Sequence, residues 1–155
     1  MRHKVMQVIV GSDHGGYELK SELLERLKTL YGDIHFKDVG VHANDRVDYP
    51  DYADMVVDQI QGKEGSLGIL MCGTGIGISM RANRFRGIRA ALVWDAFTAE
   101  MAKAHNNANI LCLGGRSIDV DTAVHCVKVW LETEYEGGRH DQRLAKLDQM
   151  RMGEN

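Results

Sequence analysis

The chain has 155 residues, of which 44% are hydrophobic and 26% charged, and it contains one proline against 17 glycines. This is the composition of a globular domain and excludes a collagen-like or disordered chain. The formal net charge of −3 provides no broad basic field for nucleic acid or an anionic membrane surface, so any basic site must be local.

The sequence favours a cytoplasmic protein. No apolar run approaches the roughly 20 residues that cross a bilayer, and residues 1–4 lead into a strand-like run without the features of a secretory signal. The cysteines are odd in number and widely spaced (Cys72, Cys112 and Cys126), which suits neither a disulfide framework nor a metal-binding pair. No repeat or linker marks a boundary, so we expect a single domain over residues 1–155.

The predicted elements alternate between strand and helix from the start of the chain. Val5 to Gly11 is a β-branched run ending in glycine, typical of a buried strand, and the leucines from Leu19 to Leu30 recur at helical spacing. Residues 34–40 predict a second strand, and Pro50 stands where it would open a second helix.

Three more strand and helix pairs follow. Strands are predicted over residues 67–72, 88–94 and 109–113, and helices end near residues 85, 104 and 135, with a charged helical tail from Gln142 onward. Strands that are apolar almost throughout indicate a parallel sheet covered on both faces. The predicted fold is a Rossmann-like α/β three-layer sandwich with a five-stranded parallel sheet and a C-terminal helical tail. Ligands bind such sheets at the carboxyl ends of the strands.

A glycine-rich turn follows the third strand, with the sequence CGTGIGIS over residues 72–79. Alternate glycines before a helix let backbone N–H groups converge on an anion. Ile78 stands where a dinucleotide-binding fingerprint needs glycine, and the lysine of a P-loop is absent. Cys72 directly precedes this turn, where converging amides would favour its thiolate, although a lone cysteine at a strand end is more often a buried structural thiol.

Other chemistry-bearing residues also stand next to strands. Asp13 and His14 follow the first strand, where the alternative reading is a turn that caps a helix. Asp95 follows the fourth strand and is more simply a helix cap than a ribose ligand. Arg139 and Arg143 lie one helical turn apart, which suits either a phosphate clamp or a solvated face.

Six blocks together resemble the type B ribose-5-phosphate isomerases, whose wider family includes allose-6-phosphate and galactose-6-phosphate isomerases. The resemblance runs from about Val8 to Arg143, in the order found in that family. It implies metal-free and cofactor-free conversion of an aldose phosphate into a ketose phosphate, in a homodimer or tetramer whose active sites are shared between subunits. The blocks are GSDHGG (11–16), DYPDYA (48–53), CGTGIG (72–77), GIRAA (87–91), HNNAN (105–109) and GGRH (137–140).

The resemblance also implies a role for individual residues. Cys72 would remove the proton from C2 of the sugar, with Thr74 assisting proton movement. His105 would open the furanose ring, with Asp13 on the other side of the sugar and Asn106 on a hydroxyl. The backbone amides that would hold the enediolate oxygens belong to Gly73, Thr74, Gly75, Ile76 and Gly77. The residues implied for the phosphate are His14, Arg116, Arg139 and Arg143, the last two from the neighbouring subunit.

Two alternatives remain at this level. A six-carbon aldose phosphate would need a longer pocket but the same mechanism, and a non-catalytic sugar-phosphate-binding subunit should have lost Cys72 or His105. Some relatives use a glutamate at the position of Ile78, so the sequence indicates the cysteine variety. The departures from the family pattern, which bear on sugar preference, are Arg81, Arg84 and Trp94.

Overall fold

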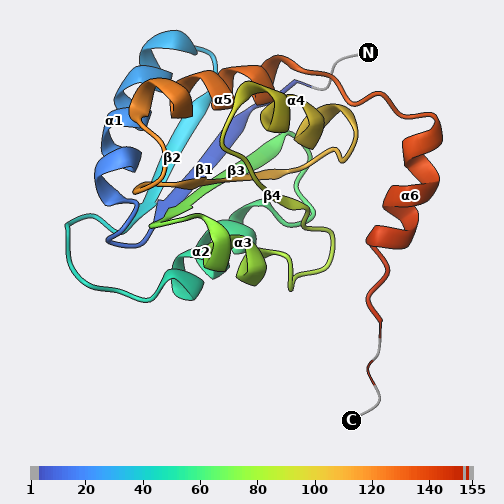
Figure 1. Ribbon diagram of the computed structural model, residues 1–155, viewed down its shortest axis with the longest axis horizontal. Coiled ribbons are helices and arrows are strands. Elements are labelled where there is room, and N and C mark those ends of the chain that lie inside the picture. Colours follow the sequence, from blue (N-terminus) through green and yellow to red (C-terminus); the bar gives the residue numbers. More distant parts are fainter. Residues whose placement is uncertain (1–3, 152, 154–155) are drawn as a thin grey trace.

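The computed structural model describes residues 4–151 and 153, which contain one five-stranded parallel sheet with the order β2-β1-β3-β5-β4. All five strands run in the same direction, so their carboxyl ends lie along one edge of the sheet (Figure 1). The strands are β1 (Gln7–Ser12), β2 (His35–Gly40), β3 (Ser66–Cys72), β4 (Ala90–Leu92) and β5 (Ile110–Gly114).

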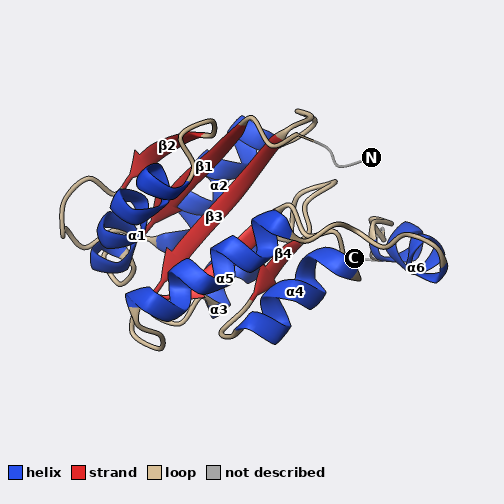
Figure 2. Cartoon of the chain, turned by 90° about the horizontal axis from the view of Figure 1, so that it is seen from above, coloured by secondary structure: helices blue, strands red, loops and turns tan. Residues whose placement is uncertain are grey.

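Helices cover both faces of the sheet, which confirms the predicted Rossmann-like three-layer sandwich (Figures 1 and 2). On one face lie α1 (Tyr17–Leu30), α4 (Ala96–Ala104) and α5 (Val120–Glu132). On the other lie α2 (Tyr49–Ile60) and α3 (Ile76–Ala82). The C-terminal α6 (Arg139–Leu147) stands apart from these layers beyond the β4 edge (Figure 1).

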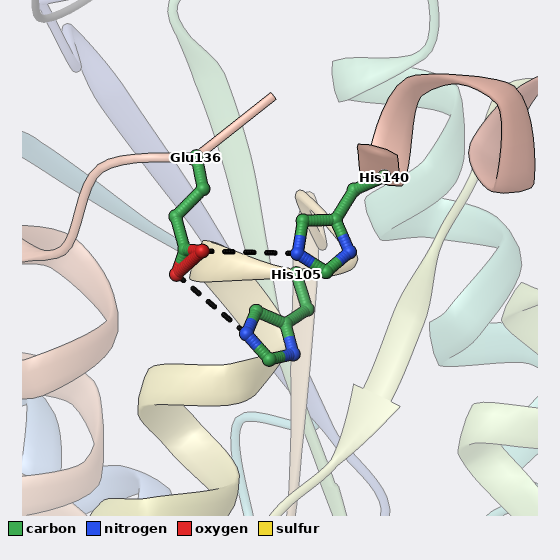
Figure 3. Close-up of side chains that lie close together, drawn as sticks. All are labelled: His105, Glu136 and His140. Carbon is green, nitrogen blue, oxygen red and sulfur yellow. Dashed lines mark ion pairs between the residues drawn. The ribbon is translucent and has the colours of Figure 1, made fainter. Parts of the chain in front are cut away.

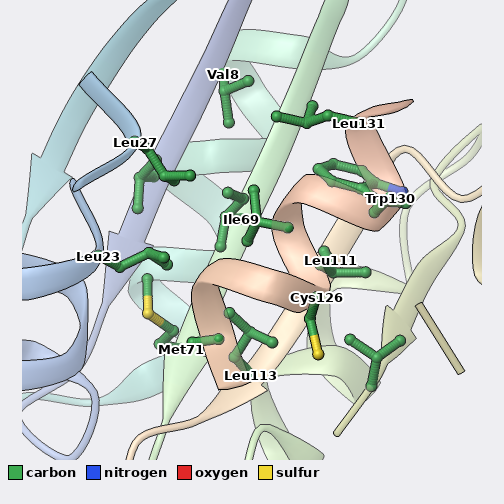
Figure 4. Packing of buried hydrophobic residues seen from close by; sticks show 14 of the residues in the cluster. Val8, Leu23, Leu27, Ile69, Met71, Leu111, Leu113, Cys126, Trp130 and Leu131 are labelled. Atoms are coloured by element: carbon green, nitrogen blue, oxygen red, sulfur yellow. The ribbon is translucent and has the colours of Figure 1, made fainter. Parts of the chain in front are cut away.

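The two cores follow from side-chain alternation along the strands. Ile69 and Met71 of β3 face the larger core, where Trp130 of α5 is fully buried and donates its indole N–H to Ala108 O at 3.1 Å (Figure 4). Leu70 and Cys72, the residues between and after them, face the smaller core under α2 and α3. The strands are therefore buried on both faces, as their continuous apolar runs predict.

Two elements differ from their predicted bounds. The strand predicted over 88–94 is limited to Ala90–Leu92, because Asn83 and Asn109 side chains occupy neighbouring backbone groups: Asn83 bonds both N and O of Ala90, and Asn109 Oδ1 accepts from Arg89 N. The tail helix begins at Arg139 and not at Gln142, since Gly137 and Gly138 have φ of 68° and 58° and turn the chain directly before it. The expectation that residues 1–4 lead into the first strand falls partly on residues 1–3, which lie outside the described residues. Within those that are described, no helix has the length and apolarity to cross a membrane.

A buried charge fixes the irregular segment 41–48 to the sheet. Lys20 of α1 is fully buried, and its Nζ donates to Asp38 Oδ1 and to Val41 O, each at 2.7 Å. Val41 N donates in turn to Ser12 O at 2.8 Å. The start of this segment is therefore paired with both α1 and β1, and this pairing places the rest of the segment beside the carboxyl end of β1.

Substitution of Lys20 by Met should lower the free energy of unfolding by about 2 kcal/mol, because the Val41 carbonyl and the partly exposed Asp38 carboxylate lose their partner. Urea unfolding measures the change. Lys28→Met is the control, since Lys28 is exposed on the same helix. A Lys20→Met protein as stable as the control would show that this buried charge does not anchor the segment.

Candidate active site

Backbone hydrogen bonds join the chain just beyond three neighbouring strands. Asp13 N donates to Met71 O at 3.2 Å, Gly115 N to Cys72 O at 2.8 Å and Arg116 N to Gly73 O at 2.9 Å. These bonds bring the residues that follow β1, β3 and β5 together at one edge of the sheet. The polar residues expected after these strands therefore share one region of the surface.

Cys72 lies at the centre of this region, 5% exposed, and its Sγ accepts the N–H of Gly75 at 3.2 Å. Gly75 precedes α3 with φ of +79°, and a Cβ there would lie 2.6 Å from Leu92 Cδ1, so glycine is required at this position. The turn thus directs a backbone donor at the sulfur. The local turn therefore suits Cys72 to chemistry as a base or nucleophile.

Among the described residues, no backbone N–H donates to the sulfur of the other two cysteines. Burial raises the pKa of the Cys112 thiol far above its usual range and that of Cys126 to about 11. Both thiols stay protonated near neutral pH and pack in the cores, Cys112 in β5 and Cys126 in α5.

The glycine-rich turn presents further amides near Cys72. The first-turn amides of a helix have no intrahelical acceptor, and one of them in α3, Ile76 N, donates to Thr74 Oγ1 at 3.2 Å. Gly77 follows it, and a Cβ there would lie 2.8 Å from the hydroxyl of Tyr49, so the absent side chain lets the tyrosine approach. Ile78 is fully buried in the core and offers no chemistry to this edge.

Asp13 and His14 are held in defined orientations after β1. Asp13 is 7% exposed, and its Oδ1 accepts from Gly16 N at 3.2 Å. His14 Nδ1 accepts from Val47 N at 3.2 Å, so a neutral His14 carries its proton on Nε2 and has a donor free for a ligand. His14 and Arg116 line the same cavity of about 350 Å³, which gives this edge two donors suited to an anion.

Two residues at this edge were not predicted from the sequence. Arg46 lines the same cavity as His14 and Arg116. Tyr49 lines, with Asp13, His14 and Arg46, an adjoining cavity of about 550 Å³. Arg46 lies in an irregular segment without a motif, so nothing in the sequence indicates it. Tyr49 lies within one of the six blocks, but its neighbour Pro50 suggested only the start of a helix.

Asp95, a candidate ligand, and the three residues named as departures from the family pattern take structural or peripheral positions. Asp95 is the N-cap of α4, where its carboxylate accepts from Thr98 N at 2.8 Å, and this bond holds its pKa below the usual range. Arg81 forms two hydrogen bonds with Asp54 of α2, at 2.7 and 3.0 Å. Trp94 is 56% exposed after β4, and Arg84 is also exposed.

The remaining site residues lie away from Cys72, toward or beyond the edge of the sheet that is formed by the amino ends of the strands. His105 ends α4 and, with Asn106, precedes β5, whereas Cys72 pairs with Gly114 at the end of β5. The length of β5 separates the two edges by about 13 Å, at roughly 3.3 Å per residue. Arg139 and Arg143 are exposed on α6, beyond the β4 edge (Figure 1). A single chain therefore does not bring His105, Asn106, Arg139 and Arg143 to Cys72.

A cluster of metal-ligating side chains lies toward the amino ends of the strands, away from Cys72. Among the described residues, one cluster of three such side chains could hold a metal ion, formed by His105, Glu136 and His140. It lies at the edge away from Cys72. The residues around Cys72 thus offer amides, a thiol and cations, a set suited to a negatively charged organic substrate.

Comparisons with known proteins agree with this chemistry. A Rickettsia typhi protein, whose name assigns it to the sugar phosphate isomerases without specifying a sugar, is 48% identical over 144 residues, covering 93% of this chain and 99% of that protein. Ribose-5-phosphate isomerase B of Escherichia coli is 39% identical over 141 residues, covering 91% and 93%. The crystal structure of ribose-5-phosphate isomerase B from Mycoplasma genitalium with bound ribulose-5-phosphate matches with a TM-score of 0.87 and 39% identity, covering 94% and 96%.

A family model described as Ribose/Galactose Isomerase matches residues 8–147. This range begins at the second residue of β1 and ends with the last residue of α6, so it contains both groups of candidate site residues. The chain belongs to the ribose/galactose isomerase family of sugar phosphate isomerases.

Proposed function

We propose that the protein interconverts ribose 5-phosphate and ribulose 5-phosphate, with Cys72 as the base. The observation that carries this proposal is the thiol of Cys72, which receives the Gly75 amide at the edge where Asp13, His14 and Arg116 gather. The name of the Escherichia coli relative and the ligand of the Mycoplasma structure support the choice of a pentose phosphate.

The proposed reaction begins on the open-chain aldose. The Cys72 thiolate takes the proton from C2, the electron pair forms the C1–C2 double bond of an enediolate, and the carbonyl oxygen at C1 takes the negative charge. The proton then returns from Cys72 to C1, and the C2 hydroxyl proton moves, with the help of Thr74, to the oxygen on C1, which gives the ketose. Amides of residues 73–77 would stabilise the developing oxyanion, by about 3 kcal/mol for each well-placed donor. No step in this sequence requires a metal or cofactor.

The phosphate would bind among the cations of the 350 Å³ cavity. His14 and Arg116 provide donors there, and Arg46 adds a second guanidinium to the lining of the cavity. A bidentate guanidinium matches the geometry of a phosphate group. We extend the expected phosphate site to include Arg46.

A second copy of the chain would complete the site. His105, Asn106, Arg139 and Arg143 lie at the opposite edge from Cys72, so they would meet a substrate held at Cys72 only by coming from another subunit. Two large apolar side chains near the β4 edge are exposed in the single chain: Met80 is 65% exposed and Phe97 66%. Exposed apolar surface of this kind supports an interface with a second subunit. We propose a homodimer, alone or within a tetramer, with active sites shared between subunits.

A six-carbon aldose phosphate is the alternative substrate, since the matching family model includes galactose in its description. A non-catalytic subunit is disfavoured because the chain retains both the thiol and the histidine that the reaction requires. A coupled assay over ribose 5-phosphate, allose 6-phosphate and galactose 6-phosphate distinguishes the substrates.

Replacement of Cys72 by Ala should lower kcat for ribose 5-phosphate by at least about a thousandfold, because the base is lost. Substrate affinity, measured by calorimetry, should change little. Cys112→Ala is the matched control, since this buried thiol packs in the neighbouring strand. A Cys72→Ala enzyme that keeps most of its kcat would exclude Cys72 as the base.

Replacement of Arg139 by Ala should raise KM about tenfold, with kcat changed far less, because phosphate binding weakens in the ground and transition states alike. Steady-state kinetics with ribose 5-phosphate provides the measurement. Lys146→Ala removes an exposed charge from the same helix and should leave KM unchanged. An unaltered KM in Arg139→Ala would assign Arg139 to a solvated helix face.

Mixing two inactive variants tests the sharing of sites between subunits. Cys72→Ala removes the base and His105→Ala removes the ring-opening group at the opposite edge, so a mixed dimer contains one intact site and one doubly damaged site. Random pairing should restore about a quarter of the wild-type activity in a symmetric dimer. Activity is assayed after joint refolding of equal amounts. Absence of recovery would show that each site is built from one chain.

A further inference from the structure

The carboxylate of Glu136 lies beside two stacked imidazole rings and faces a nitrogen of each (Figure 3). Its Oε2 is 3.6 Å from His105 Nε2, and its Oε1 is 3.7 Å from His140 Nε2. The two ring centroids are 4.3 Å apart, with an angle of 22° between the ring planes. Each oxygen of one carboxylate therefore faces one histidine, and His105 is held from its face by His140 and from its Nε2 side by Glu136.

The backbone holds Glu136 beside His105. Glu136 N donates to Ala104 O at 2.9 Å, so the residue is fixed to the last turn of α4, which His105 ends. Gly137 and Gly138 then turn the chain so that His140, in the first turn of α6, returns over the carboxylate. A hydrogen bond of 2.7 Å from the Tyr135 hydroxyl to Asp141 Oδ1 spans the same turn.

His140 is buried in surroundings that disfavour its protonated form. Its side chain is 6% exposed, and its Nε2 has no hydrogen-bond partner among the described residues. Burial lowers the pKa of His140, and the neighbouring charges of His105, Arg139 and Arg143 act in the same direction, against the opposing effect of Glu136. The second oxygen of the Glu136 carboxylate faces His105.

The ring geometry favours a positioning role over a metal site. A metal ion is bound through the nitrogen lone pair in the plane of the imidazole ring. In two nearly parallel stacked rings these lone pairs run side by side and do not converge on one ion. A carboxylate beside them instead faces the Nε2 atom of each ring.

We propose that Glu136 and His140 are positioning residues that direct the Nε2 proton of His105 to the Glu136 carboxylate and leave Nδ1 for the ring oxygen of the sugar. The proposal rests on the isomerase function proposed above. In ring opening, His105 acts from its doubly protonated form: the Nδ1 proton passes to the ring oxygen as the bond from C1 to that oxygen breaks, and the Nε2 proton stays on the ring, facing Glu136. The Asp13 carboxylate accepts the anomeric hydroxyl proton as the C1 carbonyl forms.

The test separates ring opening from proton transfer at carbon. Ribose 5-phosphate forms a furanose through its C4 hydroxyl, whereas ribulose 5-phosphate has no free C5 hydroxyl and stays open-chain. Exchange of the C1 hydrogens of ribulose 5-phosphate in D2O, followed by NMR, therefore needs Cys72 but no ring opening. Net turnover of ribose 5-phosphate needs both.

Glu136→Gln should lower kcat for ribose 5-phosphate about tenfold or more, since general acid catalysis is impaired, while the C1 exchange rate stays within about twofold of the wild type. His140→Phe keeps a stacking ring without Nε2 and should lower turnover in the same selective way. Glu134→Gln is the control, because Glu134 is exposed two residues earlier on the same segment; neither of its rates should change.

Three results would overturn the proposal. Unchanged turnover in Glu136→Gln or His140→Phe would remove that residue from the unit. Equal loss of turnover and exchange would indicate general structural damage in place of positioning. A chelator that lowers wild-type turnover to the level of Glu136→Gln would assign the cluster to a metal. Absence of C1 exchange in the wild-type enzyme would instead contradict the isomerase function itself, so the two failures are distinguishable.

Discussion

The parallel pairing of β3 with β5 places the proposed base and the proposed ring-opening group at opposite ends of the strands. Because the strands run in the same direction, residues at their carboxyl ends gather at one edge, and residues that precede them gather at the other. Cys72 is the last residue of β3, whereas His105 precedes β5. The chemistry of one chain is thus divided by the sheet, and assembly with a second chain offers the simplest way to reunite it.

The fold could be predicted almost entirely from the sequence because both faces of the sheet are covered. Continuous apolar runs such as residues 67–72 have no other stable environment in a globular domain of this composition. The differences arise where side chains replace backbone pairing. Asn83 and Asn109 limit the edge strand β4, and the paired glycines 137 and 138 start α6 early, which hydrophobic periodicity does not register.

The half of the site around Cys72 was also accessible to prediction, since its members follow strands or lie in the glycine-rich turn. Arg46 and Glu136 were not, and for a shared reason. Each occupies an irregular segment whose position depends on contacts distant in sequence: Lys20 with Val41 for the first, and Ala104 with the Glu136 backbone for the second. Local patterns carry no information about such contacts.

The pairing of Val41 has a consequence for motion near the substrate. Its N–H and its carbonyl are both engaged, by Ser12 and by the fully buried Lys20, so opening this residue would require disrupting the interior. The segment that carries Arg46 is therefore held in place at its first residue, Val41. Only the residues after it, of which 42–46 are exposed, can move independently of the sheet. The segment is held again at Val47, whose N–H bonds His14 Nδ1, so the side chain proposed to reach the phosphate lies in a short exposed loop fixed at both ends.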